Sequence, residues 1–220
     1  MTPYLKDYVY EENAKPDIII REELYKNNKI YPENMSLELL AYLQSGNQFF
    51  SRVLAFNGLY MHASAVELDG NAYLFSADSG TGKSTHTSIW KNVFGEKATV
   101  FNDDKPVLRV LDGKWYAYGT PWCGKDHINV NMRVPVAGIC FLKQASENTI
   151  RLINKTDAAL RIFEQSLRYM KNKERLDLIL PLIDTLVRDI PVFELENRPE
   201  PEAALLSYKT MKQAAEELGL

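Results

Sequence analysis

The stretch ADSGTGKS at residues 77–84 decides the fold. It fits the pattern G-x-x-x-x-G-K-(S/T), except that Ala77 stands in place of the first glycine. Gly80 and Gly82 let the backbone fold tightly around an anion with its N–H groups pointing inward. An apolar run at Ala72–Phe75 is the expected strand before the stretch, and residues 83–94 have helical spacing. Because the positive end of that helix would face the same anion, the stretch predicts a phosphate-binding loop.

The polar side chains of this loop have chemical roles if it holds a polyphosphate. Lys83 can reach the β- and γ-phosphate oxygens, and the Ser84 hydroxyl can ligate Mg²⁺. The alternative is a glycine- and serine-rich turn between a strand and a helix that binds nothing. The residues expected to contact the phosphates are Ser79, Gly80, Thr81, Gly82, Lys83, Ser84 and Thr85.

Two adjacent carboxylates, Asp103 and Asp104, follow a short strand expected at Thr99–Phe101. If that strand runs parallel to Ala72–Phe75, both carboxyl ends open on the same edge of the sheet, where ligands bind. Two carboxylates there can divide the work: one supports Mg²⁺, and the other accepts a proton from an attacking hydroxyl. The alternative is a surface turn, which the Asn-Asp-Asp-x-Pro sequence also favours.

Composition narrows the class of protein. The chain has 220 residues, of which 26 are basic and 29 acidic, for a net charge of −3. This balance argues against bulk nucleic-acid binding and against an acidic disordered tail. No apolar run is long enough to span a membrane, and the N-terminus lacks the pattern of a signal peptide. Cys123 and Cys140 are not spaced as metal ligands, so a reduced, cytoplasmic setting is expected.

The remaining pattern predicts an α/β fold, with a mixed β core and a helical C-terminal third. We expect one domain with an N-terminal region at 1–55, a nucleotide-binding core at 56–145 and a mainly helical region at 146–220. Strands are expected at 17–21, 59–68, 107–111, 115–118, 136–142 and 191–195, with 149–153 pairing with 136–142. Helices are expected at 36–55, where Gly46 is a candidate break, and at 156–170, 174–187 and 201–218.

Histidines and a glycine-containing loop supply further candidates. Alternation along the strand at 59–68 places His62 on the same face as Ser64, and a lone strand histidine is usually packed in the core. In the loop GTPWCGKDH at residues 119–127, Lys125 and His127 are candidate substrate contacts that could face the γ-phosphate. The alternative is a surface hairpin loop with solvated charges. The other candidates are Asp126 as a metal ligand, Trp122 as core or site, and His86, which is expected at the surface with contact to a nucleotide as the alternative.

The order of these motifs is more specific than any one of them. Residues 60–63 (YMHA), the loop at 77–84 and the pair Asp103-Asp104 resemble the catalytic domain of bacterial HPr kinase/phosphorylase. That domain shares its nucleotide fold with the phosphoenolpyruvate carboxykinases, and the resemblance covers roughly residues 56–144. It implies a kinase that acts on a peptide or protein serine, and it suggests a homo-oligomer.

The resemblance also implies a role for each matching residue. Lys83 would contact the phosphates, Ser84 would ligate Mg²⁺, and Asp104 would accept the proton of the substrate hydroxyl. The resemblance places His62 beside the transferred phosphate as a supporting residue. The division of work between the two acids leaves Asp103 as the acid that supports Mg²⁺. The expected catalytic side chains are then Lys83, His62, Asp103 and Asp104, and the expected cofactors are ATP and Mg²⁺.

The chain also departs from that family. It has no room for the additional N-terminal domain of the bifunctional enzyme, and the segment with a glutamate metal ligand and an arginine-glycine run is not evident. Residues 119–127 stand in its place. The chain looks more like the shorter HPr-kinase-like proteins, some of which serve peptide-modification systems, and both HPr as substrate and the reverse phosphorolysis are therefore in doubt.

The favoured function is an ATP- and Mg²⁺-dependent kinase that phosphorylates a hydroxyl of a peptide, a protein or a small metabolite. A nucleotide-dependent binding module or switch is the alternative; it would need Lys83 and Ser84 but no general base. A carboxykinase ranks lower, because the chain is short and a carboxylate-binding arginine is not apparent. The sequence leaves open the acceptor and the choice among ATP, ADP, GTP and pyrophosphate as donor.

Overall fold

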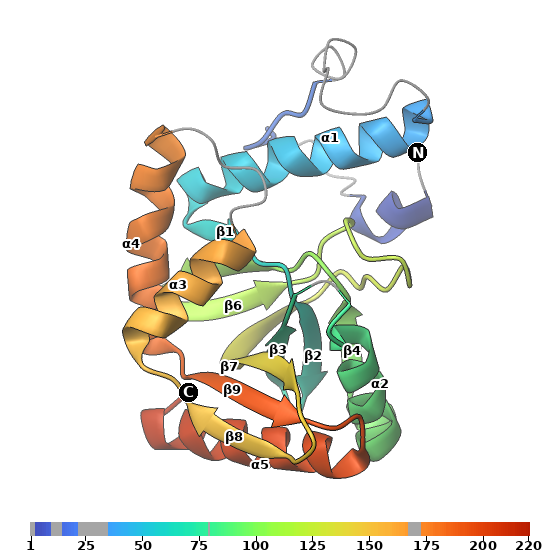
Figure 1. Ribbon diagram of the computed structural model, residues 1–220. Helices are drawn as coiled ribbons and strands as arrows, with labels where there is room; N and C mark the ends of the chain where they lie inside the picture. Colours follow the sequence, from blue (N-terminus) through green and yellow to red (C-terminus); the bar gives the residue numbers. More distant parts are fainter. Residues whose placement is uncertain (1–2, 10–14, 22–34, 79, 167–172) are drawn as a thin grey trace.

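The computed structural model describes residues 3–9, 15–21, 35–78, 80–166 and 173–220 (Figure 1). Within these residues, nine strands form one mixed sheet whose main order is β1-β5-β6-β7-β3-β2-β4, with β9 beside β7 and β8 beside β9. The strands are β1 (Gly58–Tyr60), β2 (Ser64–Leu68), β3 (Asn71–Ser76), β4 (Thr99–Asn102), β5 (Val107–Leu111), β6 (Lys114–Tyr118), β7 (Arg133–Gln144), β8 (Thr149–Leu152) and β9 (Val192–Asn197). The protein therefore has a mixed α/β architecture.

Strand directions bring two loops to one edge of the sheet. β2 pairs antiparallel with both β3 and β4, so β3 and β4 run in the same direction with β2 between them. On its other side β3 pairs parallel with β7, and β7 pairs parallel with β9. The carboxyl ends of β3, β4, β7 and β9 therefore open on the same edge, which confirms the shared direction expected for 72–75 and 99–101.

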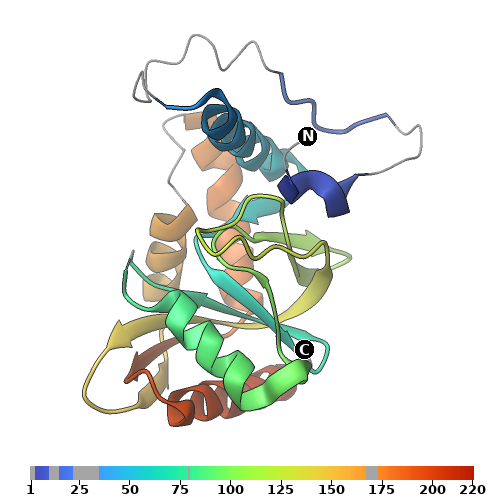
Figure 2. The same ribbon diagram turned by 90° about the vertical axis from the view of Figure 1, so that its right-hand side faces the viewer.

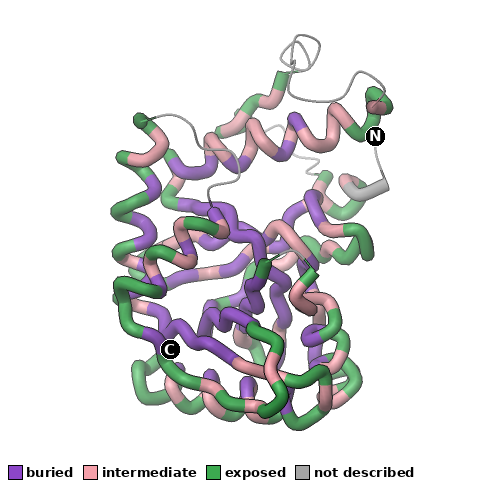
Figure 3. The backbone as a smooth tube through the Cα atoms, in the orientation of Figure 1, coloured by how far each residue is buried: buried purple, intermediate pink, exposed green. Residues whose placement is uncertain are grey.

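Helices cover both faces of the sheet. Along β3, Tyr73 and Phe75 face one side, where they pack with α2 (Lys83–Phe94) and α5 (Pro201–Leu218). The ribbons of these two helices are green and red in Figure 2. Leu74 faces the other side and packs against α3 (Lys155–Ser166) and α4 (Lys173–Asp189). Successive side chains of a strand point to opposite faces of the sheet, so β3 contributes residues to the hydrophobic cores on both faces. Figure 3 shows buried residues running through the strands between these helices.

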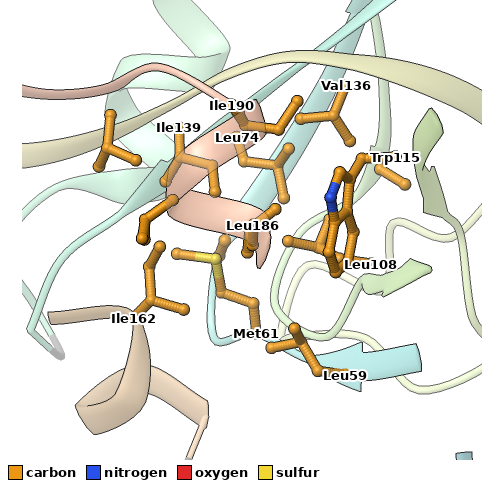
Figure 4. Packing of buried hydrophobic residues seen from close by; sticks show 14 of the residues in the cluster. Leu59, Met61, Leu74, Leu108, Trp115, Val136, Ile139, Ile162, Leu186 and Ile190 are labelled. Atoms are coloured by element: carbon orange, nitrogen blue, oxygen red, sulfur yellow. The ribbon is translucent and has the colours of Figure 1, made fainter. Parts of the chain in front are cut away.

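The larger core lies under α3 and α4 (Figure 4). Met61 and Ile139 are fully buried there, beside Ile162 of α3 and Leu186 of α4. Burying each such side chain contributes roughly 1.5–3 kcal/mol, so this cluster fixes the sheet against the helices. It also anchors the segment after β1, from which His62 projects.

A third cluster attaches α1 (Leu37–Arg52) to the sheet through Phe50, Tyr60 and Trp122. Gly46 does not break this helix. A Cβ on Gly46 would lie 3.0 Å from Cδ1 of Trp122, so the glycine lets the helix pass close over the indole ring. Two short 3-10 helices, η1 (Pro3–Tyr8) and η3 (Val53–Phe56), lie on this side, and η4 (Gly95–Lys97) follows α2.

Several expectations need correction. Residues 149–152 pair with β9 and not with the strand at 136–142, because β9 lies between them. Residues 17–21 form no strand. The expected strand at 59–68 is two strands, with residues 61–63 between them outside the ladder. The helices at 83–94 and 201–218 have the expected bounds, α3 ends at Ser166, and residues 167–170 lie outside the described part.

Within the described ranges, no helix has the length and apolar content that crossing a lipid bilayer would need.

Candidate active site

The turn between β3 and α2, residues 77–82, is here called the glycine turn. Gly80 has a φ of +83° and Gly82 a φ of +106°, which L side chains rarely adopt. An added Cβ at either glycine would meet no atom within 4 Å, so the requirement for glycine is conformational and not steric. Ala77 is not among the described residues with positive φ, and it can therefore replace the first glycine of the pattern. Ser79 lies outside the described residues.

The first turn of α2 presents cationic and dipolar groups at the end of the glycine turn. Among the described residues no side chain caps this helix at Gly82, which leaves its first N–H groups for another acceptor. The ammonium of Lys83 folds back and donates to the carbonyl oxygen of Ala77 at 3.0 Å. Thr81 N donates to Asp78 O at 3.1 Å, which tightens the turn. These groups form the geometry expected of an anion cradle.

The glycine turn and the paired acids line one cavity of about 420 Å³, the active-site cavity below. The carboxyl ends of β3 and β4 therefore place the ammonium of Lys83 and the carboxylates of Asp103 and Asp104 around one cavity. The cavity also receives the loop after β6. Its lining residues are His62, Gly80, Gly82, Lys83, Ser84, Thr85, Asp103, Asp104, Gly124, Lys125 and Asp126.

Asp104 is held by two neighbours. Its Oδ1 lies 2.9 Å from Nε2 of His62, and its Oδ2 accepts from Nζ of Lys105 at 2.5 Å. Burial raises the pKa of Asp104, but the hydrogen bond from His62 and the charge of Lys105 outweigh burial and hold the pKa far below its ordinary value. Asp104 is therefore a carboxylate throughout the neutral pH range.

His62 is oriented by Gln165, near the end of α3. The Nδ1 atom of His62 lies 2.9 Å from Oε1 of Gln165, and the backbone N–H of His62 donates to the Gln165 carbonyl at 3.0 Å. The histidine is 5% exposed. Because both ring nitrogens have partners, His62 links α3 to Asp104 and fixes the carboxylate in the cavity.

The Asp103 residue is more deeply buried than Asp104. Its Oδ1 accepts from the backbone N–H of Gly124 at 2.5 Å, and the residue is 5% exposed. Burial raises the pKa of Asp103, the Gly124 hydrogen bond lowers it, and the charge of Asp104 raises it, with a net increase. A Cβ on Gly124 would lie 2.8 Å from Oδ2 of Asp103, so this position admits only glycine without displacement.

Two side chains that line this cavity, Ser84 and Asp103, are suited to bind a divalent cation beside a phosphate. The Asp103 carboxylate and the Ser84 side chain line the same cavity, and oxygen ligands suit Mg²⁺. A cation would also offset the two adjacent carboxylates. Within the part of the chain that the structure describes, no group of three or more His, Cys, Asp or Glu residues could hold a metal by itself. Oxygen atoms from outside this set of side chains, such as those of a ligand or of water, would complete the coordination.

Asn102, the last residue of β4, shapes the turn that carries both acids. Its Oδ1 accepts from the N–H groups of Asp104 at 3.1 Å and Lys105 at 2.6 Å. Its Nδ2 donates to the carbonyls of Thr120 and Trp122, each at 3.1 Å. This fully buried amide therefore joins the acidic turn to the loop that brings Gly124 into the cavity.

The other candidates fall into separate places. Lys125 and Asp126 line the active-site cavity, whereas His127 is exposed and is not among the lining residues. Trp122 is buried against Phe49 and Phe50, which makes it part of the core.

The expected surface position of His86 was wrong. His86 is 1% exposed, stacks edge-on against Phe75 and lies 3.3 Å from the Ser207 hydroxyl of α5. The sequence pattern for α2 correctly assigned a helix but did not reveal that α5 covers this face.

Sequence reasoning missed four residues that shape the site: Asn102, Lys105, Gly124 and Gln165. Lys105 adjoins Asp104 and could have been found by asking which cation neutralises a paired acid. Gln165 is separated from His62 by 103 residues, and nothing in its helical surroundings marks it. The role of Gly124 depends on a close approach that only the tertiary structure shows.

The chain matches a protein family over most of its length and is similar to a solved structure at low sequence identity. A family model described as SynChlorMet cassette protein ScmC matches residues 29–198. Among solved structures, the HPr(Ser) kinase/phosphatase from Coxiella burnetii is similar, with 11% sequence identity over 73% of this chain and 92% of that chain and a TM-score of 0.44. Nothing about activity follows from a similarity of that size. The search of curated proteins found no match.

Proposed function

We propose that this chain, which belongs to the ScmC family of SynChlorMet cassette proteins, is a kinase that transfers the γ-phosphate of ATP to a hydroxyl group. One observation carries the proposal. A carboxylate kept ionised by His62 and Lys105 faces the same cavity as the glycine turn and Lys83. A general base beside an anion cradle is what phosphoryl transfer to a hydroxyl requires.

The phosphates of the donor would lie on the glycine turn. Backbone N–H groups at the start of α2 donate to them, and Lys83 exchanges its hydrogen bond to the Ala77 carbonyl for a phosphate oxygen. A charged acceptor is the stronger partner, so the exchange favours the bound state. Mg²⁺ held by Ser84, Asp103 and phosphate oxygens would screen the negative charge of the donor.

The transfer step follows from the position of Asp104. The acceptor oxygen forms a bond to the γ-phosphorus, the bond from that phosphorus to the β,γ-bridging oxygen breaks, and ADP leaves with the electron pair. The proton of the hydroxyl passes to Asp104. His62 and Lys105 leave lone pairs on the carboxylate for that hydroxyl, because a carboxylate offers about four acceptor positions.

The lowered pKa of Asp104 is compatible with this role. A weakly basic carboxylate orients the hydroxyl and takes the proton late, after the bond to the leaving group has loosened. Lys125 and Asp126 line the cavity beyond Asp104 and would contact the acceptor. We propose that the acceptor is a serine of a peptide or protein, or the hydroxyl of a small metabolite.

The test is transfer of label from γ-³²P-ATP to a panel of serine-containing peptides and hydroxyl metabolites. Asp104→Asn should lower transfer by about 1,000-fold, because the amide cannot accept the proton. Its affinity for MgATP should stay within about two-fold of the wild type, because Asp104 does not hold the donor. Asp112→Asn, in the exposed β5–β6 turn, is the matched control and should retain full transfer.

Two outcomes would contradict the proposal. Near-normal transfer by Asp104→Asn would remove Asp104 as the base. Slow hydrolysis of ATP with no transfer to any hydroxyl compound would instead favour a nucleotide-dependent switch.

A further inference from the structure

A second cavity of about 330 Å³ adjoins the first across the glycine turn. The two cavities share Gly82 and Thr85 as lining residues. The remaining wall comes from the loops after β7 and β9. The lining residues of this second cavity are Thr81, Gly82, Thr85, His86, Gln144, Ala145, Asn197 and Pro199.

The second cavity lies on the opposite flank of the glycine turn from the acids. Gln144 and Asn197 are the last residues of β7 and β9 and are paired with each other in the ladder. Asp104 follows β4, which lies beyond β2 on the other side of β3 (Figure 1). A polyphosphate on the glycine turn with its terminal phosphate at Asp104 therefore points its other end toward Gln144 and Asn197.

The lining of the second cavity suits an uncharged, polar ring. Thr81 and Thr85 contribute hydroxyl groups, and the amides of Gln144 and Asn197 can both donate and accept. Among the described residues, no carboxylate or ammonium lines it. Its volume lies within the range of roughly 300–1,000 Å³ that small-molecule sites occupy.

His86 gives a second, independent indication that the second cavity binds a ligand. It also lines this cavity, it is 1% exposed, and its Nδ1 is a buried ring nitrogen without a hydrogen-bond partner among the described residues. An unpaired buried polar atom is costly, and such atoms in a native fold often mark a place that a ligand or water completes. A hydrogen-bonding group in the cavity is the available partner.

We propose that the second cavity binds the nucleoside part of the phosphate donor. The donor is then a nucleoside triphosphate and not pyrophosphate or an inorganic polyphosphate. This inference rests on the proposed function for the direction in which the phosphates lie. The amides of Gln144 and Asn197 would read the edge of the base, and the threonine hydroxyls would contact the sugar or the α-phosphate.

The test compares binding of Mg-ATP and Mg-tripolyphosphate by calorimetry. Both carry three phosphates, but tripolyphosphate has one more ionisable oxygen where ATP has its nucleoside, so charge alone would favour tripolyphosphate. The wild type should bind ATP at least about 10-fold more tightly than tripolyphosphate. Ala145→Trp should fill the second cavity, weaken ATP binding to the level of tripolyphosphate and leave tripolyphosphate binding unchanged. Ser146→Trp, at the next and exposed position outside the cavity, is the matched control and should behave as the wild type.

The outcomes separate this inference from the kinase proposal. Equal affinity of the wild type for ATP and tripolyphosphate would overturn the nucleoside site while leaving the cradle intact, and so would normal ATP binding by Ala145→Trp. Failure of both compounds to bind the wild type would overturn the proposed function as well. If Ala145→Trp loses tripolyphosphate too, the bulk has disturbed the turn. Gln144→Trp, at the exposed end of β7, then decides by the same comparison.

Discussion

The regions around His62 and His86 contain similarly buried imidazoles with opposite surroundings. His62 is 5% exposed and stands between a carboxylate and an amide at the active-site cavity. His86 is 1% exposed and stands between Phe75, Trp90 and Ser207, where no charged group is its partner. The two imidazoles are therefore buried to a similar degree but differ in the charge of the groups that contact them.

The first turn of α2 likewise has one residue that faces the active-site cavity, Lys83, and one that is buried against α5, His86. Lys83 points back over the glycine turn, and His86, one turn on, enters the core under α5. Changes on the two sides should therefore have separate consequences. Substitution at Lys83 should affect binding and spare stability, whereas substitution at His86 should affect stability first.

The largest effect is expected from the titration of His86. Burial lowers the pKa of His86 to about 4, from 6.5 in a model compound. The unfolded chain binds the proton more readily, so the stability from the neutral imidazole is complete above pH 6.5 and is lost as pH falls toward 4. A shift of this size corresponds to about 3 kcal/mol in the free energy of unfolding. Urea unfolding at a series of pH values between 6.5 and 4 measures it.

His86→Gln should be less stable at neutral pH and should show a flatter dependence on pH over this interval. His127→Gln, which replaces an exposed histidine, is the control and should keep the wild-type slope. An unchanged slope in His86→Gln would show that the imidazole is not held neutral in the core.

Lys83→Ala tests the cavity side of the same helix turn. Loss of the ammonium should weaken Mg-ATP binding by about 100-fold, because one charge-assisted hydrogen bond to phosphate is removed. The free energy of unfolding should change little. Lys91→Ala, on the exposed side of α2, is the matched control. Wild-type affinity in Lys83→Ala would contradict the assigned role of the cradle.

Gln165→Leu tests whether His62 needs its amide partner. The leucine keeps the approximate size but removes the amide that contacts Nδ1 of His62, so the imidazole should lose its fixed orientation and kcat should fall about 10-fold. Affinity for Mg-ATP should not change. Gln165→Glu keeps an oxygen at that position and should recover most of the rate, while Glu164→Leu on the exposed side of α3 should have no effect. Equal kcat for Gln165→Leu and the wild type would leave Gln165 with no positioning role.

Gly124→Ala should have the smallest effect. The new Cβ would meet Oδ2 of Asp103 at 2.8 Å and push the carboxylate aside by a few tenths of an ångström. The Mg²⁺ concentration for half-maximal activity should rise roughly three-fold, because a small misplacement weakens but does not remove one ligand. A Mg²⁺ dependence identical to the wild type would place the metal away from Asp103.

The local part of the fold could be predicted from the sequence. The bounds of α2 and α5 follow from helical spacing and from Gly95 and Pro201 at their ends. The hairpin of β5 and β6 follows from Asp112-Gly113, which has the positive φ angles expected of that turn. The position of β9 could not be predicted, because pairing between distant strands leaves little trace in either strand alone.

Part of the candidate site could likewise be predicted from the sequence, and part of it could not. The sequence placed the glycine turn and the acids at 103–104 on one edge only on the condition that the two preceding strands run parallel, and the pairing of both strands with β2 meets that condition. The partners of Asp104 could not be predicted, since His62 lies in a break between strands and its amide partner is on a distant helix. The depth of His86 depends on α5, which begins over a hundred residues later.

The most direct test of the central claim is a crystal structure with Mg²⁺ and a non-hydrolysable ATP analogue. We expect phosphates on residues 80–85, Nζ of Lys83 withdrawn from the Ala77 carbonyl, and the γ-phosphate facing Asp104. Phosphates bound elsewhere, or a γ-phosphate on the side away from Asp104, would contradict that claim.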